Sequence, residues 1–118
     1  HNPIHLTHRD GDGFISSIAP ESGFLYWIAY VSLTENTTNS CYITQVDYEQ
    51  FDGIIFIGGW SEAGTLHFYN KDATVSSFSI EIPPSGSVFV GQLHPNGTWL
   101  WGETVKPRNY CYPPGSCI

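Results

Sequence analysis

The sequence predicts an all-β fold: a Greek-key β-sandwich of two related halves, forming a single domain over residues 1–118. Aromatic residues make up 15% of the chain, which is typical of strand-rich packing. The 12 glycines and 8 prolines indicate many turns. No long apolar stripe recurs with the helical period, so helices are not expected. A chain of 118 residues is long enough to bury one modest core.

The predicted strands follow one another with turn sequences between them. The longest, "GFLYWIAYVSL" (residues 23–33), is a nearly continuous apolar run, typical of a strand buried on both faces. "GIIFIGGW" (53–60) ends in a glycine pair that indicates a turn or bulge. "TLHFY" (65–69) and "SSFSIEI" (76–82) alternate as half-buried strands do. "TWLW" (98–101) is expected to place Trp99 and Trp101 on one face. Because "SEAG", "PPSG" and "HPNG" separate these short runs, a sandwich or barrel is predicted.

Two segments about half a chain apart resemble each other. One is "DGFISSIAPESGFLYW" from Asp12, and the other is "DATVSSFSIEIPPSGSVFV" from Asp72. Each has an Asp, a branched aliphatic residue and Ser-Ser, then Pro, Ser-Gly and an apolar run. Such similarity indicates a duplicated supersecondary unit. The alternative is that Ser-Ser and Pro-Ser-Gly recur by chance in a Ser-rich β protein.

The second segment, with "GQLHPNGTW" after it, resembles the Greek-key motif of the βγ-crystallins, whose loop pattern is Asn/Asp-Asn/Asp-X-X-Ser/Thr-Ser. The second acidic position of that pattern is Gly13 in one copy and Ala73 in the other. The resemblance implies weak calcium sites, because calcium takes six to eight oxygen ligands and an acid is missing from each loop. The candidate calcium ligands are Asp12, Ser16, Asp72 and Ser76. The alternative is a loop stabilised by Asp and Ser side chains without metal.

The charge balance excludes two classes of partner. The formal net charge is −7, from 4 Lys and Arg against 11 Asp and Glu. A nucleic-acid-binding surface needs clustered basic residues, so nucleic acid is not an expected partner. An anionic membrane surface is disfavoured for the same reason. No apolar run approaches the roughly 20 residues of a transmembrane helix.

Several features predict a secreted, extracellular protein. The chain has no methionine and begins at His1, which predicts a mature form whose leader has been removed. Asn36 and Asn96 begin sequons for N-glycosylation. The cysteines are Cys41, Cys111 and Cys117. One disulfide is expected, with the third thiol free or forming a disulfide-linked dimer, and the sequence does not choose the pairing.

Histidines near the start of the chain suggest a second metal. An N-terminal His1 can chelate copper through its amino group and ring when another histidine, such as His5, approaches. This makes a copper-dependent oxidative enzyme a distant alternative. No spacing of nucleophile and base indicates a hydrolase, so the protein is expected not to be an enzyme.

Large aromatic residues are the remaining candidates for function, and the alternative is that most of them belong to the core. Trp60, Trp99 and Trp101 are the candidate ligand-binding residues because indole rings stack on sugars. The resemblance extends to secreted microbial killer-toxin-like proteins, which implies a defence or antimicrobial role. The sequence thus predicts a secreted binding protein that recognises a cell-surface component, and the alternative is a carbohydrate-binding lectin.

Overall fold

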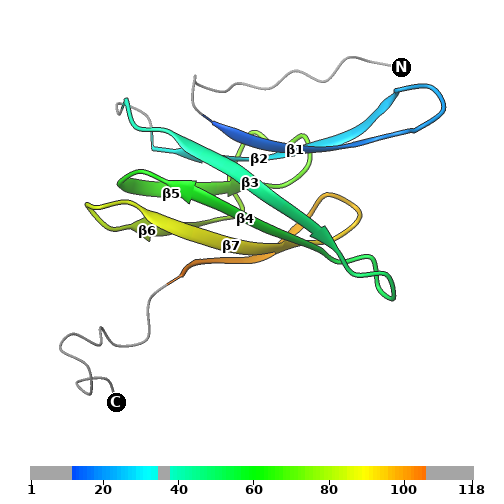
Figure 1. Cartoon of the computed structure of the whole chain (residues 1–118). Coiled ribbons are helices and arrows are strands. Elements are labelled where there is room, and N and C mark those ends of the chain that lie inside the picture. The colour runs from blue at the N-terminus through cyan, green and yellow to red at the C-terminus, as the bar shows by residue number, and fades with distance from the viewer. Residues whose placement is uncertain (1–11, 35–37, 106–118) are drawn as a thin grey trace, which may run out of the picture.

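The computed structural model describes residues 12–34 and 38–105, and these residues form a β-sandwich (Figure 1). It contains eight strands and no helix within those ranges. The strands are β1 (Gly13–Ile18), β2 (Leu25–Leu33), β3 (Cys41–Tyr48), β4 (Ile55–Ser61), β5 (Gly64–Tyr69), β6 (Phe78–Ile82), β7 (Ser87–Leu93) and β8 (Trp99–Thr104). The all-β prediction is confirmed.

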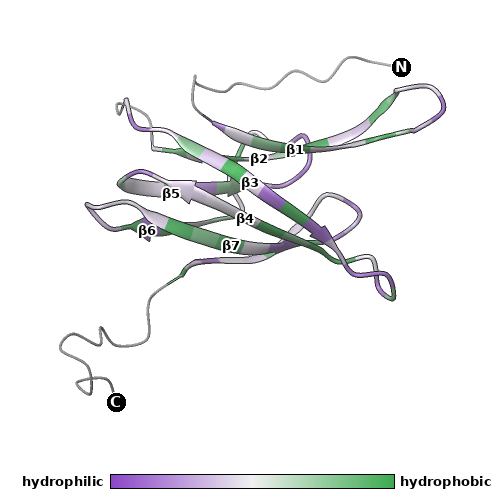
Figure 2. Cartoon of the chain, viewed as in Figure 1, coloured by the Kyte–Doolittle hydropathy of each residue, from purple (hydrophilic) through white to green (hydrophobic). Residues whose placement is uncertain are grey.

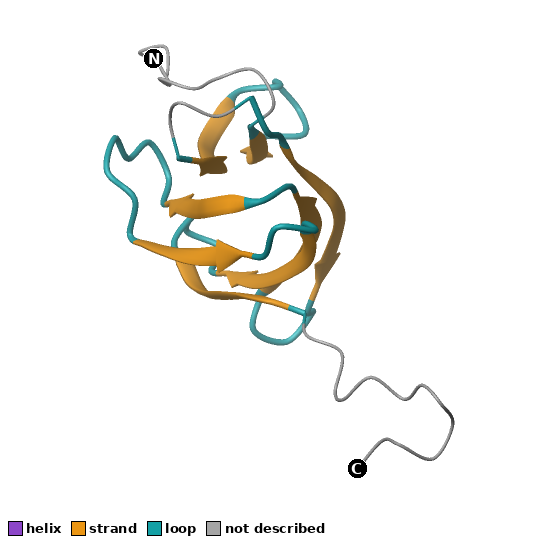
Figure 3. Ribbon diagram, turned by 90° about the vertical axis from the view of Figure 1, so that its left-hand side faces the viewer, coloured by secondary structure: helices purple, strands orange, loops and turns teal. Residues whose placement is uncertain are grey.

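The strands form two antiparallel sheets that face each other (Figure 3). The first sheet has the order β1-β2-β5-β6, and the second has the order β3-β4-β7-β8. Successive hairpins alternate between the sheets, so each half of the chain contributes one hairpin to each. In the four consecutive strands β2 to β5, β5 returns to lie beside β2, while the hairpin β3–β4 lies in the opposite sheet. In the same way β7 returns to lie beside β4, while the hairpin β5–β6 lies in the opposite sheet. This return of a fourth strand to the side of the first is the pattern of a Greek key.

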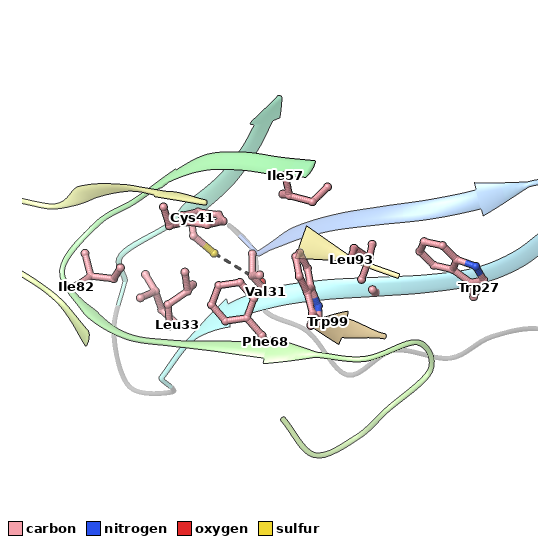
Figure 4. Packing of buried hydrophobic residues seen from close by; sticks show 12 residues of the cluster. Trp27, Val31, Leu33, Cys41, Ile57, Phe68, Ile82, Leu93 and Trp99 are labelled. Carbon is pink, nitrogen blue, oxygen red and sulfur yellow. Dashed lines mark hydrogen bonds between the residues drawn. The ribbon is translucent and has the colours of Figure 1, made fainter. Parts of the chain in front are cut away.

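The core lies between the sheets and is rich in aromatic rings (Figure 4). Phe68 of β5 is fully buried and stacks on Phe78, with ring centroids 4.7 Å apart. The Phe68 ring also makes edge-to-face contacts with two rings of the second sheet. Its centroid lies 5.0 Å from that of Trp99 and 6.0 Å from that of Phe89. Edge-to-face contacts of this kind add stability beyond burial alone. Phe68 therefore joins the two layers.

A β-bulge in β8 separates the two tryptophans that were expected to share a face. Leu93 pairs with Trp99, but the preceding Gln92 pairs with Trp101, so Leu100 is an extra residue between them. Trp99 is 4% exposed and lies in the core, whereas Trp101 is 40% exposed. The expectation of a shared face is wrong because the bulge reverses the alternation.

The two similar segments have different local structures. Ser16 lies in β1, where it pairs with Ile28 of β2. Ser76 lies in the loop between β5 and β6, where Asp72 has a positive φ of 54°. The two segments nonetheless come close to each other, because the N–H of Asp72 donates at 3.0 Å to the carbonyl of Ile28, the β2 residue that pairs with Ser16. The Ser-Ser pair thus lies in a strand in the first copy and in a loop in the second, and the kinship with βγ-crystallins stays a prediction.

Several predicted residues lie outside the described ranges: His1, His5, Asn36, Cys111 and Cys117. Copper binding, the first sequon and the disulfide pairing therefore stay predictions. Cys41 begins β3 and is buried, with its Sγ 3.6 Å from the carbonyl oxygen of Val31. Within the described part of the chain, no helix has the length and apolarity to cross a membrane.

Candidate functional site

The outer surface of the second sheet carries four large aromatic side chains. Tyr42 of β3, Phe56 and Trp60 of β4 and Trp101 of β8 are 51%, 43%, 38% and 40% exposed. Strand alternation explains their position: in β4 the neighbours Ile57 and Gly59 are buried, so Phe56 and Trp60 face outward. We call this surface the outer aromatic face. Hydrophilic and hydrophobic residues are mixed along β3, the edge strand of this face (Figure 2).

The strand register arranges the outer aromatic face into three rows. Directly paired residues of antiparallel strands point to the same side and lie about 5 Å apart. The rows are Tyr42–Trp60–Val88, then Gln45–Gly58–Val90–Glu103, then Asp47–Phe56–Gln92–Trp101. The two outer rows carry the aromatic rings. The middle row carries amide, carboxylate and small apolar groups.

Glycine in the middle row leaves the position between two aromatic residues of β4 without a side chain. A Cβ added at Gly58 would meet one described atom within 4 Å, the Cβ of Gln45 at 3.4 Å. Phe56 and Trp60 lie two residues to either side of Gly58 in the same strand, so their Cα atoms are about 13 Å apart. We call this stretch without a side chain, between the rings of Phe56 and Trp60, the Gly58 trough.

A hollow of about 410 Å³ adjoins the Trp60 end of the outer aromatic face. Its lining combines aromatic, amide, hydroxyl and carboxylate groups, from Asn39, Tyr42, Trp60, Glu62, Ala63, Pro84, Ser85 and Gly86. Two of the polar side chains are held in place by the backbone. Oε1 of Glu62 accepts from the N–H of Ser40 at 2.8 Å, and Nδ2 of Asn39 donates to the carbonyl of Ala63 at 2.9 Å.

Local contacts also fix the two exposed indole rings. Gly86 has a φ of 78°, and a Cβ there would lie 2.6 Å from the ring carbon Cζ2 of Trp60. Its backbone thus lies against the edge of the Trp60 ring, and a larger residue would displace that ring. At the other end, Nε1 of Trp101 donates to Oε1 of Gln92 at 2.7 Å. Both rings are therefore oriented before any ligand arrives, which lowers the entropic cost of binding.

This arrangement suits a sugar. The C–H face of a pyranose ring packs on an indole, while its hydroxyl groups need acceptors and donors around the rim. A carboxylate such as Glu62 has four lone-pair sites, so its bond to Ser40 leaves it able to accept from a ligand hydroxyl. The charged side chains of the face and hollow are Asp47, Glu62 and Glu103. They are all acidic, which favours an uncharged ligand over an anionic one.

The sequence identified part of this site. Of the three tryptophans that the sequence proposed as ligand-binding residues, Trp60 and Trp101 lie on the outer aromatic face. The third, Trp99, lies in the core, where its Nε1 donates to the carbonyl of Tyr69 at 3.0 Å. Sequence reasoning missed Tyr42 and Phe56. Their exposure follows from pairing with distant strands, and the nearest sequence signal is the polar and aromatic pattern "CYITQVDY" of β3.

Two of the candidate calcium ligands, Asp12 and Ser76, lie beside residues of the first sheet. Asp12 and Ala73 both approach Tyr30. Burial and the negative charge of Asp12 both raise the pKa of Tyr30, and the Tyr30 hydroxyl donates to the carbonyl of Ala73 at 3.4 Å. Oγ of Ser76 lies 3.4 Å from Nδ1 of His67. Among the residues that the structure describes, no three His, Cys, Asp or Glu side chains are grouped so as to hold a metal ion. Calcium binding stays a prediction, which a calcium titration of thermal unfolding tests.

Tyr30 has an unusual environment for a tyrosine. It is 4% exposed, and its ring stacks on that of Tyr69 with centroids 4.3 Å apart and an interplanar angle of 4°. Burial, followed by the charges of Tyr69 and Asp12, raises the pKa of Tyr30 above its ordinary value. Each of these effects disfavours the phenolate. The raised pKa thus has a structural cause.

The second sequon lies in the loop between β7 and β8. Asn96 is exposed, and its Oδ1 accepts from the N–H of Thr98 at 3.0 Å. Its glycosylation stays a prediction. This loop does not line the hollow, which is formed by residues around the start of β3 and the end of β4 and by residues 84–86.

The chain was compared with family models, curated proteins and solved structures, and none of them matches it. No relative therefore assigns an activity to any of its residues. The outer aromatic face and the adjoining hollow are the features from which a function is inferred.

Proposed function

We propose that this protein is a non-enzymatic carbohydrate-binding protein that recognises a cell-surface glycan through its outer aromatic face. The observation that supports this most strongly is the position of Trp60. Its indole ring lies against Gly86 and lines the hollow together with Glu62 and Asn39. An aromatic ring for the C–H face of a sugar is thus adjacent to polar groups for its hydroxyls.

A protein partner is the other occupant that an exposed aromatic surface could suggest. The cores of protein interfaces are enriched in Arg as well as aromatic residues, and are depleted in Asp and Glu. Within residues 12–34 and 38–105, Lys71 is the sole Lys or Arg, and it lies in the β5–β6 loop. The outer aromatic face instead mixes aromatic rings with carboxylates and amides. These features favour a glycan.

The wider role expected from the sequence is secretion and defence. Recognition of a glycan in the wall of a competing microbe is a mechanism by which a rigid sandwich would serve that role. The defence role is tested by measuring the growth of a test fungus or bacterium in the presence of the purified protein. Inhibition that is lost together with glycan binding would support defence, and binding without inhibition would leave a lectin.

Affinity electrophoresis through gels containing soluble polysaccharides tests the proposed function. The informative variant is Trp60→Ala, and the matched control is Tyr26→Ala, because Tyr26 is 64% exposed but belongs to β2 of the first sheet. We expect the wild type and the control to be retarded equally. Trp60→Ala should bind about tenfold more weakly or worse, the equivalent of about 1.4 kcal/mol.

Circular dichroism and thermal unfolding of both variants check that the fold is retained. Two results would overturn the proposal. One is the absence of retardation by any uncharged, cationic or anionic polysaccharide. The other is equal binding by wild type and Trp60→Ala, since the sugar would then lie elsewhere.

A further inference from the structure

We propose that the site binds an extended, uncharged sugar chain at two aromatic subsites, with the Gly58 trough as the path between them. This inference rests on the proposed carbohydrate-binding function. The first subsite is Trp60 with Tyr42, and the second is Phe56 with Trp101. A single sugar would occupy one subsite, and a chain would occupy both.

The separation of the subsites sets the minimum size of the ligand. Phe56 and Trp60 are four residues apart in β4, which corresponds to about 13 Å along the strand. That distance exceeds the width of one sugar ring but is spanned by a short oligosaccharide. Simultaneous contact raises the affinity, because the second subsite is reached without a second loss of translational freedom.

The path between the subsites is open and polar along one side. A Cβ at Gly58 would find the Cβ of Gln45 at 3.4 Å as its one described neighbour within 4 Å. Gln45 lies opposite Gly58 in β3, and Val90 lies opposite it in β7. The amide of Gln45 can both donate to and accept from sugar hydroxyls along one wall of the trough, while Val90 gives the other wall an apolar surface.

The second subsite has its own polar rim and its own charge. Gln92 lies between Phe56 and Trp101, and its Oε1 accepts from Trp101 Nε1 at 2.7 Å. Asp47 pairs with Phe56, and Glu103 pairs with Val90 in the middle row. With Glu62 at the first subsite, a carboxylate lies near each part of the path. An anionic polysaccharide would therefore be repelled, and an uncharged chain would not.

The test is a calorimetric titration with β-linked glucose and N-acetylglucosamine oligomers of one to six units. Polygalacturonate serves as the anionic comparison. Two variants address the second subsite and the path: Phe56→Ala removes a ring, and Gly58→Val fills the trough. A Cβ at Gly58 makes an ordinary 3.4 Å contact with the Cβ of Gln45, and thermal unfolding of Gly58→Val checks that the larger side chain leaves the fold intact. Ser79→Val is the matched control, since it adds bulk to the outer side of the first sheet.

For the wild type we expect affinity to rise about tenfold or more between one unit and the length that spans both subsites, and then to level off. Phe56→Ala and Gly58→Val should abolish this rise while leaving the weak binding of short oligomers. Ser79→Val should bind as the wild type does, and polygalacturonate should not bind.

Equal affinity for one unit and for six would overturn the two-subsite proposal but leave the carbohydrate-binding function standing. A full length dependence in Gly58→Val would also overturn it, because the chain would not cross the trough. Preference for polygalacturonate would contradict the charge argument. If no oligomer and no polysaccharide binds, both the proposed function and this inference fail.

Discussion

The indole N–H of Trp101 donates a hydrogen bond of 2.7 Å to the side-chain oxygen of Gln92 on the neighbouring strand. The two residues are directly paired in the register of β7 and β8. The bond orients the Trp101 ring on the outer aromatic face, although the side chain is substantially exposed. A surface tryptophan with a fixed ring is the arrangement that a preorganised binding site requires.

Removing the partner of Trp101 should weaken glycan binding without unfolding the protein. We expect Gln92→Leu to reduce the affinity for long oligomers by an amount that matches one hydrogen bond, about 0.5–1.5 kcal/mol. Calorimetric titration measures this change, and urea unfolding provides the stability control. Unchanged affinity in Gln92→Leu would show that orientation of the Trp101 ring does not matter for binding.

Quenching of tryptophan fluorescence should distinguish the four indoles of the chain. Trp60 and Trp101 are exposed, whereas Trp27 and Trp99 are buried in the core. An oligosaccharide that spans the face should protect the exposed pair from acrylamide and leave the buried pair unaffected. Trp60→Phe together with Trp101→Phe should remove most of the quenchable signal. Equal quenching with and without a bound oligomer would place the ligand away from both rings.

The adjacent glycines of β4 should respond in opposite ways to the same substitution. A Cβ at Gly59 would clash with the carbonyl oxygen of Tyr42 and the ring of Phe89, so Gly59→Ala should lower the free energy of unfolding by about 1–3 kcal/mol. At Gly58 an added Cβ has room, so Gly58→Ala should raise the free energy of unfolding by about 0.5–1 kcal/mol. Urea denaturation measures both. Equal destabilisation would contradict the assignment of inner and outer faces.

The raised pKa of Tyr30 predicts a loss of stability in alkali. The phenol is favoured over the phenolate in the folded state by burial, Tyr69 and Asp12, in that order. Its stabilising contribution is therefore complete below the ordinary tyrosine pKa of about 10 and is lost as the pH rises through the folded-state value. Ultraviolet titration should show one late-ionising tyrosine that disappears in Tyr30→Phe.

Tyr69→Phe provides the control for this titration. It keeps a ring for the stack but removes the neighbouring hydroxyl, and the pKa of Tyr30 should then fall toward the ordinary value. A Tyr30 that ionises together with the other tyrosines would show that its ring is not buried as described.

The fold class could be predicted from sequence because it depends on local patterns. The apolar run of β2 and the alternation in β5 and β6 are visible in the chain itself. β3 was not predicted, since a bulge between Ile43 and Gln45 interrupts its alternation and its second half is exposed. A bulge in β8 likewise reversed the expected relation of Trp99 and Trp101. Bulges depend on the partner strand, which a local pattern does not contain.

The candidate site could be predicted only in part. Trp60 and Trp101 were identified by residue type, because large aromatic residues in a β domain lie either in its core or on a binding surface. Tyr42 lies beside Trp60 through the pairing of β3 with β4. Phe56 and Trp101 share a row through Gln92 of β7. These relationships depend on long-range strand pairing, so the site became recognisable only once the register was known.

The most direct test is a map of backbone amide chemical shifts during titration with a sugar oligomer that binds. The account predicts that the largest changes fall in the second sheet, at Tyr42, Gln45, Phe56, Gly58, Trp60 and Trp101, with amides of the first sheet nearly unchanged. Changes that gather on the outer side of the first sheet, around Tyr30 and His67, would contradict it.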